Sequence, residues 1–304
     1  MGRRPRHPGL HDPRGHELPH RVVEVSGVPT WLVDSGEGPP VLLIHGYGDS
    51  ADGWRRVVPG LMGAHRVIAL DVPPFGRSGK PEAERLIDFY ELYFPELFDR
   101  LGLDSATVIG HSLGGAIALR LTLARPDLVD RLGLVAPAGL GEGPPWWWHA
   151  LAGYGLAWRA VLSIPGPLTP LLIRQGLKRF LDWRLCHDPR RMNAEIRHFV
   201  EMHGSSDSLE RLLEAGRCCI DSYNGELLEE SRSIRCPVWM VWGRQDGLVP
   251  STHARSFAEA VPGAEVHVFE SCGHYPQMEL PGRFNELLGA WLDGTSQDEL
   301  AEAA

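Results

Sequence analysis

One stretch decides the fold of this chain: Val108-Ile109-Gly110-His111-Ser112-Leu113-Gly114-Gly115. Its apolar start predicts a strand, and the residues that follow from Ala116 favour a helix. Between them lies the pattern Gly-x-Ser-x-Gly, whose turn is so tight that the flanking positions must be glycine. Such a turn holds a serine hydroxyl above the edge of a sheet and is known as a nucleophile elbow.

Short apolar runs alternate with helical patterns on both sides of this elbow. The first run covers residues 21–33 and is broken at Ser26-Gly27 like a hairpin. Six more runs predict strands: residues 41–44, 67–70, 107–109, 132–135, 238–242 and 265–269. Wholly apolar runs are expected of strands that are covered on both faces. The alternation predicts an α/β fold, with a mostly parallel central sheet and helices on both faces.

The pattern at residues 86–101 is helical. Its apolar members recur at helical spacing: Leu86, Tyr90, Tyr93, Phe94, Leu97 and Leu101. Pro95 interrupts it, and because proline has no backbone N–H and crowds the preceding turn, we expect a kink or a restart there.

The chain divides into four parts along its length. Residues 21–139 and 236–294 carry the strand and helix alternation and form the expected core. Residues 140–235 have apolar periodicity but no convincing buried strand, which predicts a helical cap inserted after the sixth strand. Residues 1–20 are rich in arginine, proline and histidine and have no apolar segment, so we expect a disordered leader and no signal peptide. Residues 295–304 are expected to form a flexible tail.

Composition and net charge argue against a nucleic-acid-binding protein, and the cysteine spacing argues against a zinc or disulfide-rich protein. The 304 residues are 43% hydrophobic and 23% charged, as in an ordinary globular protein, and a net charge of −9 argues against nucleic acid as a partner. The five cysteines have no spacing typical of a zinc site or a disulfide framework, so we expect reduced thiols and a cytoplasmic protein. We expect neither a metal nor an organic cofactor.

Three adjacent tryptophans, Trp146, Trp147 and Trp148, stand near the start of the expected cap. Prolines interrupt the apolar stretch that follows, so it falls short of the roughly 18 apolar residues of a spanning helix. Burial within the cap, contact with an apolar substrate and contact with a membrane surface all remain open for these side chains.

Ser112 is the candidate nucleophile, and it needs partners because a serine hydroxyl is a weak nucleophile at its own pKa. Backbone donors must stabilise the oxyanion that forms during its attack. The N–H of Leu113, at the start of the helix, is one expected donor. The other is the N–H of Tyr47 in the loop His45-Gly46-Tyr47-Gly48, which follows the strand at 41–44.

His274 is the expected base, because it follows the last predicted strand and so faces the same sheet edge as Ser112. Asp246, which follows the strand at 238–242, is the expected acid that orients it. We assign its rival, Asp71, to a motif that fixes a loop, and His45 to a structural role in its own loop. The order serine, aspartate, histidine along the chain is that of the α/β-hydrolases.

The chain resembles a cap-bearing α/β-hydrolase from about Arg21 to Leu292. The resemblance rests on His45-Gly46, Asp71-x-Pro73, the elbow glycines Gly110 and Gly114, Trp242-Gly243-x-x-Asp246 and Gly273-His274. It implies a serine hydrolase similar to esterases and to meta-cleavage product C–C hydrolases. Two details depart from the C–C group: His111 stands where asparagine is usual, and the loop at 45–48 has fewer glycines. Pro74 stands where the superfamily usually has glycine, so we expect a local change in that turn.

We expect a carboxylic ester hydrolase that works through Ser112, His274 and Asp246 and an acyl-enzyme. Its substrate is expected to be a small molecule with an apolar acyl or aromatic group, contacted by the tryptophans and by Tyr275. The alternative is a C–C bond hydrolase, in which Arg174, Arg184 or Arg197 binds a substrate carboxylate. A non-catalytic binding protein of the same fold is the third alternative, because fold alone does not prove function. The oligomeric state stays open.

Overall fold

The computed structural model describes residues 10–11, 14–141, 168–219 and 226–294. Its centre is an eight-stranded sheet with the order β1-β2-β4-β3-β5-β6-β7-β8. The strands are β1 (His20–Val25), β2 (Val28–Ser35), β3 (Pro40–Ile44), β4 (Arg66–Leu70), β5 (Ala106–His111), β6 (Val129–Val135), β7 (Val238–Gly243) and β8 (Glu265–Phe269). β2 pairs antiparallel with β1 and β4, and the pairs from β4 to β8 are parallel. The predicted α/β fold with a mostly parallel sheet is confirmed.

The first two strands form the expected hairpin. Val25 pairs with Val28, so the turn consists of Ser26 and Gly27, and both have positive φ, 49° and 72°. Two positive φ values are the mark of a type I′ turn, whose twist matches that of the strands it joins.

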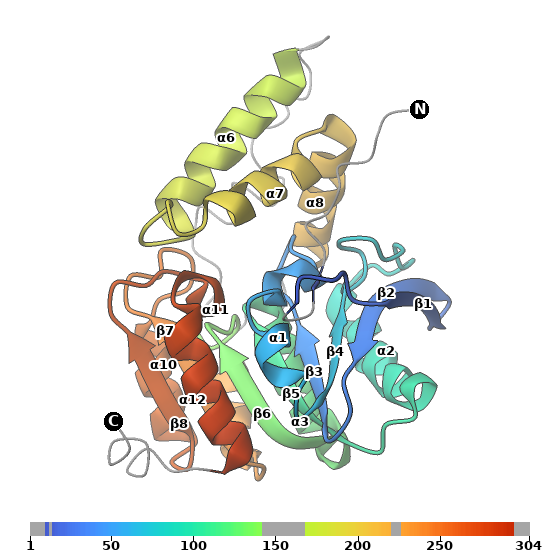
Figure 1. Ribbon diagram of the computed structural model, residues 1–304, viewed down its shortest axis with the longest axis vertical. Coiled ribbons are helices and arrows are strands. Elements are labelled where there is room, and N and C mark those ends of the chain that lie inside the picture. Colours follow the sequence, from blue (N-terminus) through green and yellow to red (C-terminus); the bar gives the residue numbers. More distant parts are fainter. Residues whose placement is uncertain (1–9, 12–13, 142–167, 220–225, 295–304) are drawn as a thin grey trace.

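Helices cover both faces of the sheet (Figure 1). The helices of the described residues are α1 (Val58–Leu61), α2 (Leu86–Leu101), α3 (Leu113–Ala124), α6 (Leu168–Arg184), α7 (Asn193–His203), α8 (Ser206–Cys219), α9 (Glu226–Glu230), α10 (Thr252–Ala260), α11 (Pro276–Glu279) and α12 (Pro281–Asp293), with the short 3₁₀ helices η1 (Ala51–Trp54), η2 (Pro126–Leu128) and η5 (Ser231–Ser233). In β3, Leu42 and Ile44 pack in the core shared with α2 and α3, whereas Val41 and Leu43 pack in the core shared with α12. Successive side chains of a strand point to opposite faces, so an apolar run fills two cores.

Pro95 does not divide its helix. α2 runs from Leu86 to Leu101 as one element with Pro95 inside it, so of the two expected outcomes, a kink or a restart, the restart is wrong. Tyr93, Phe94 and Leu97 on either side of the proline are fully buried in the core. Their packing outweighs the cost of a proline inside a helix, which is about 3 kcal/mol for the missing hydrogen bond and the crowded ring together.

The described residues of the expected cap are helical. α6, α7 and α8 contact one another and stand together over the end of the sheet at which the parallel strands finish (Figure 1). α9 and η5, however, contact α3 and α10 of the core, and Leu227 is buried there. The chain has therefore returned to the core before residue 235, the boundary expected from the sequence.

Part of the leader is ordered. Leu10 and Leu18 are buried in the core that contains α12, and the Leu18 N–H donates to the Leu10 carbonyl over 2.6 Å. The expectation of disorder across residues 1–20 does not hold for these residues, because their leucines cover apolar surface of the core. Residues 1–9 and 12–13 and the tail at 295–304 lie outside the described residues.

Candidate active site

Ser112 stands between β5 and α3, in a strained turn. Its φ of 53° and ψ of −116° are far from the regions that a side chain normally permits. A Cβ at Gly110 would strike the carbonyl of Gly114, and a Cβ at Gly114 would strike the carbonyls of Ile44 and His45. The turn therefore requires both glycines, as predicted from the motif.

The backbone around Ser112 is firmly held. Its N–H donates to Val135 O over 2.9 Å, and its carbonyl accepts from Ala138 N over 3.0 Å as well as from the first turn of α3. Leu113 is the first residue of α3, at the positive end of the helix dipole. Ser112 is largely buried, with only 8% of the residue exposed.

Asp246 follows β7 and is surrounded by hydrogen-bond donors. Its Oδ1 accepts from the backbone N–H groups of Leu248 and Val249 over 2.8 and 2.9 Å. Its Oδ2 accepts from the Trp242 indole over 3.1 Å and from His274 Nδ1 over 2.7 Å. The carboxylate is fully buried, so these donors replace the water that it gave up and fix its direction.

His274 follows β8 and is 2% exposed. Because Nδ1 donates to Asp246, the orientation of the ring is fixed, and Nε2 is the ring nitrogen that this bond does not use. The backbone N–H of His274 donates to Leu185 O over 2.8 Å. Leu185 follows α6, so the loop that carries the histidine is held from the cap side.

His111 joins the serine turn to the histidine loop. Its Nε2 donates to the His274 carbonyl over 2.9 Å, and its ring centre lies 4.8 Å from that of His274. Burial holds the pKa of His111 well below its usual range, so this ring is neutral. The residue singled out by its place before Ser112 thus braces the expected base through the backbone.

The loop at 45–48 forms a turn closed by a hydrogen bond from Asp49 N to Gly46 O over 3.2 Å. Gly48 has a φ of +70°, which glycine adopts without strain. A Cβ on Gly46 would lie 3.1 Å from Cβ of Ser112, so this turn passes directly beside the serine. The structure therefore brings the backbone of Tyr47 to the same edge as Ser112, as the sequence predicts.

His45 uses both ring nitrogens within its own loop. Nδ1 donates to Gly46 O over 2.7 Å, and Nε2 accepts from Val72 N over 2.8 Å. Burial lowers the pKa of His45, so the ring stays neutral in this role.

Asp71 acts as the centre of a folded loop. It accepts from Ala51 N over 2.7 Å and from the backbone and side chain of Arg77 over 2.6 Å each. The positive φ of this loop is at Gly76, 60°, and the Pro73–Pro74 peptide bond is cis. Asp71 is fully buried with these partners and lies apart from His274, which binds Asp246 instead.

Sequence reasoning missed Asp49. It is buried, accepts from Ser50 N over 2.8 Å and lies 3.2 Å from the hydroxyl of Tyr275, which donates to it. Burial raises the pKa of Asp49 to about 7. The centre of the Tyr275 ring lies 4.3 Å from that of the His111 ring. The carboxyl group of Asp49 is therefore connected to His111 by a single aromatic side chain, that of Tyr275. Its position directly after the loop at 45–48 was the available signal.

The expected substrate contacts are only partly visible. Trp146, Trp147 and Trp148 lie outside the described residues, and the hydroxyl of Tyr275 is used by Asp49. Arg174 and Arg197 are exposed. Arg184 donates to Gly247 O over 3.3 Å and stacks 3.8 Å from the centre of the Trp183 ring.

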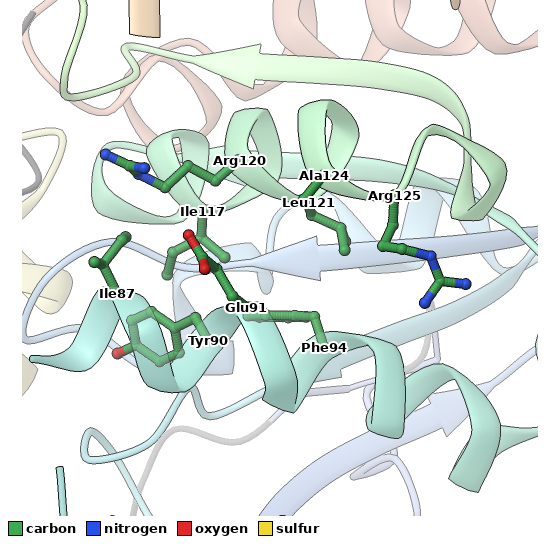
Figure 2. A pocket seen from close by; sticks show the side chains of 9 residues that line it. All are labelled: Ile87, Tyr90, Glu91, Phe94, Ile117, Arg120, Leu121, Ala124 and Arg125. Carbon is green, nitrogen blue, oxygen red and sulfur yellow. The ribbon is translucent and has the colours of Figure 1, made fainter. Parts of the chain in front are cut away.

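A hollow lies away from this site, between α2 and α3. Figure 2 shows side chains of the two helices facing each other across it, among them Ile87, Phe94, Ile117 and Arg120. None of the predicted site residues lines it. It is therefore separate from the candidate site at Ser112.

The fold and the motif residues together match a known family. Residues 39–281 match the family model described as the alpha/beta hydrolase fold. The chain belongs to the α/β-hydrolase fold family. The resemblance predicted from the motifs is confirmed, and the chain is therefore assigned as a hydrolase.

Several relatives cover most of this α/β-hydrolase. The 2-hydroxymuconate semialdehyde hydrolase of Pseudomonas sp. (strain CF600) is 30% identical over 90% of this chain and 93% of its own length. An uncharacterized protein of Mycobacterium tuberculosis is 30% identical over 89% of this chain and 80% of its own length. Among solved structures, a meta-cleavage product hydrolase from Pseudomonas fluorescens IP01 has a TM-score of 0.74, with 26% identity over 90% of this chain and 97% of that one. A membrane phospholipase A shares the fold with a TM-score of 0.75. It is 23% identical over 91% of this chain and 86% of that one.

Within the residues described, no helix of this hydrolase is long and apolar enough to cross a membrane.

Proposed function

We propose that this protein is a serine-dependent carboxylic ester hydrolase that acts on a small apolar or aromatic acyl substrate. The observation that carries the proposal is the hydrogen bond of 2.7 Å from His274 Nδ1 to Asp246, at the sheet edge where Ser112 occupies a strained elbow. A buried carboxylate that orients a histidine near a serine held in a tight turn is the arrangement of acyl-transfer enzymes.

The proposed reaction has two halves. His274 takes the proton of Ser112 as the hydroxyl attacks the ester carbonyl, and the N–H groups of Tyr47 and Leu113 hold the oxyanion. Collapse of the tetrahedral intermediate breaks the C–O bond to the leaving alkoxide, which takes the proton from His274 and departs as the alcohol, and an acyl-enzyme remains. Water then attacks the acyl group and gives a proton to His274; the bond from the acyl carbon to Ser112 breaks, the serine oxygen takes that proton back, and the acid leaves. Each oxyanion donor is expected to contribute about 2.7 to 4 kcal/mol to the transition state.

Cleavage of a carbon–carbon bond is the second candidate, because the relatives include a 2-hydroxymuconate semialdehyde hydrolase at 30% identity. Against it stand His111 before the serine and the positions of the three candidate arginines. Arg174 and Arg197 are exposed, and Arg184 contacts Trp183 and Gly247. A cytoplasmic location remains part of the proposal, as does an apolar substrate.

The test is Ser112→Ala against a series of p-nitrophenyl esters of increasing acyl length. We expect kcat to fall by about 10⁴-fold or more and labelling by a fluorophosphonate to disappear. Ser233→Ala, an exposed serine in η5, is the control and should keep full activity. Turnover of a coloured ring-fission dienoate without turnover of any ester would replace ester cleavage with carbon–carbon cleavage. Labelling that persists in Ser112→Ala would refute the nucleophile itself.

A further inference from the structure

Helix α7 of the cap is fastened to the core at both of its ends. In its first turn, Glu195 accepts from Arg55 over 2.5 Å and pairs with Arg56 over 2.8 Å. Its last residue, His203, donates from Nε2 to the Gly48 carbonyl over 2.7 Å. The helix therefore lies along the segment that begins at the turn beside Ser112 and ends after η1.

Helix α8 holds the same turn at a second point. The Tyr47 hydroxyl donates to the Leu212 carbonyl in α8. A Cβ on Gly48 would lie 3.1 Å from Phe199 of α7 and would also meet Leu212, so these two side chains pack directly on the glycine. Both central residues of the turn are thus gripped by the cap.

The contacts of α7 and α8 with this turn limit how far the expected oxyanion donor, the N–H of Tyr47, can move. Gly46 and Gly48 flank Tyr47, and glycine leaves the backbone more free to rotate than any other residue. A donor to an oxyanion must nevertheless stay within a few tenths of an ångström of its position to stabilise the transition state. The closing hydrogen bond from Asp49 N to Gly46 O does not by itself fix the two central peptide planes.

We propose that the cap helices α7 and α8 position the oxyanion turn, with His203 as the positioning residue that holds the Gly48 carbonyl. The inference rests on the proposed function, because it assigns the oxyanion donor to Tyr47. The turn is then in its active geometry only while α7 and α8 are seated. Packing of the cap on the core and formation of the oxyanion site therefore occur together.

The chemistry of His203 suits a fixed donor. It is 9% exposed, and burial lowers its pKa to about 4, so the ring is neutral at physiological pH. A carbonyl can only accept, so the proton lies on Nε2. Glutamine can present an N–H at a similar distance from the backbone, whereas leucine fills the space without a donor.

The experiment compares His203→Leu with His203→Gln on the best ester substrate. We expect His203→Leu to lower kcat by about 10- to 100-fold with KM changed less than about threefold, because only the transition state carries the oxyanion. His203→Gln should recover most of the loss. Tyr47→Phe, which removes the other hydrogen bond from the cap, should lower kcat in the same way.

Hydrogen exchange of the peptide that contains residues 45–52 provides a readout that needs no substrate. It should exchange faster in His203→Leu than in the wild-type protein, because the Gly48 carbonyl has lost its donor. Ile173→Val is the control: it removes one methyl from the fully buried side of α6 and should change neither kcat nor this exchange.

The outcomes separate the two proposals. Wild-type kcat and unchanged exchange in His203→Leu would overturn the inference while the ester hydrolase stands. A loss of activity that appears in KM alone, or that glutamine does not repair, would also overturn it. If Ser112→Ala kept wild-type turnover, the proposed function would fall, yet faster exchange in His203→Leu would still show that the cap fixes the turn.

Discussion

At the scale of single residues, the site depends on hydrogen bonds that reach the backbone of its loops. His111 is the clearest case, because its Nε2 donates to the His274 carbonyl and its ring packs against the rings of His274 and Tyr275. Asp49 is a second case, since it binds Tyr275 and the N–H of Ser50. Neither needs to touch a substrate to decide where His274 lies.

Replacement of His111 by alanine should be costly. We expect the free energy of unfolding to fall by about 2 to 4 kcal/mol, because a buried ring leaves a cavity and a buried carbonyl loses its donor. Urea denaturation measures this loss. His111→Gln keeps an N–H within reach of the carbonyl and should lose less. Equal losses in the two variants would mean that packing alone accounts for the effect.

At the scale of elements, the elbow works because α3 approaches β3 with no side chain between them. Gly114 is in the first turn of α3, against the carbonyls of Ile44 and His45 at the end of β3. That contact sets the distance between Ser112 and the turn at 45–48. The helix start, the strand end and the oxyanion turn are therefore one packed unit.

Gly114→Ala should break this unit. A Cβ there overlaps backbone atoms that cannot move aside, so we expect a loss of more than about 3 kcal/mol of stability, or no folded protein at all. Gly289 in α12 is the matched control, since a Cβ there meets nothing within 4 Å. Gly289→Ala should stabilise by about 0.5 to 1 kcal/mol, because alanine favours a helix. Thermal denaturation of both variants checks the contrast.

At the scale of the whole molecule, the cap holds both loops that carry the proposed chemistry. α7 and α8 grip the turn at 45–48, and the Leu185 carbonyl accepts from the His274 N–H. Glu279 completes the second link, because its carboxylate accepts from His187 N and from Gly273 N over 2.9 and 2.8 Å. Residues of the core and of the cap thus both hold the loops of the candidate site in position.

The buried titratable groups give the molecule a defined response to pH. His45, His111 and His203 have lowered pKa values, so the unfolded chain binds protons below about pH 6.5 that the folded chain does not. These groups lower stability as the pH falls from 6.5. Asp49 acts in the opposite direction: its raised pKa means that the folded chain holds a proton between about pH 4 and 7 that the unfolded chain has released.

Asp49→Asn isolates one of these contributions. At pH 8 the variant should be more stable than the wild-type protein, because no charge has to be buried. The advantage should shrink by up to about 1.4 kcal/mol per pH unit as the pH falls from 7 toward 4. Urea denaturation at several pH values measures the difference. A difference that stays constant across this range would show that Asp49 is ionised in the folded protein.

The sequence by itself determined the sheet, the elbow and the loops that hold Ser112, Asp246 and His274. These follow from short-range rules: apolar runs form buried strands, a tight turn needs glycine, and the ends of parallel strands meet at one edge. The α/β fold and the family were predictable for this reason. The assignment of Ser112, Asp246, His274, Tyr47 and Leu113 to catalytic roles stays a proposal.

Only the tertiary structure decided the rest, because it depends on contacts between segments far apart in the chain. No local pattern shows that His203 meets Gly48, 155 residues away, or that Tyr275 meets Asp49, 226 residues away. The same holds for Leu10 and Leu18, whose burial in the core overrides a disordered composition, and for Pro95, which packing keeps inside a helix. The local rules made the positions of the candidate site loops predictable, but which residues hold those loops depended on how the cap packs against the core.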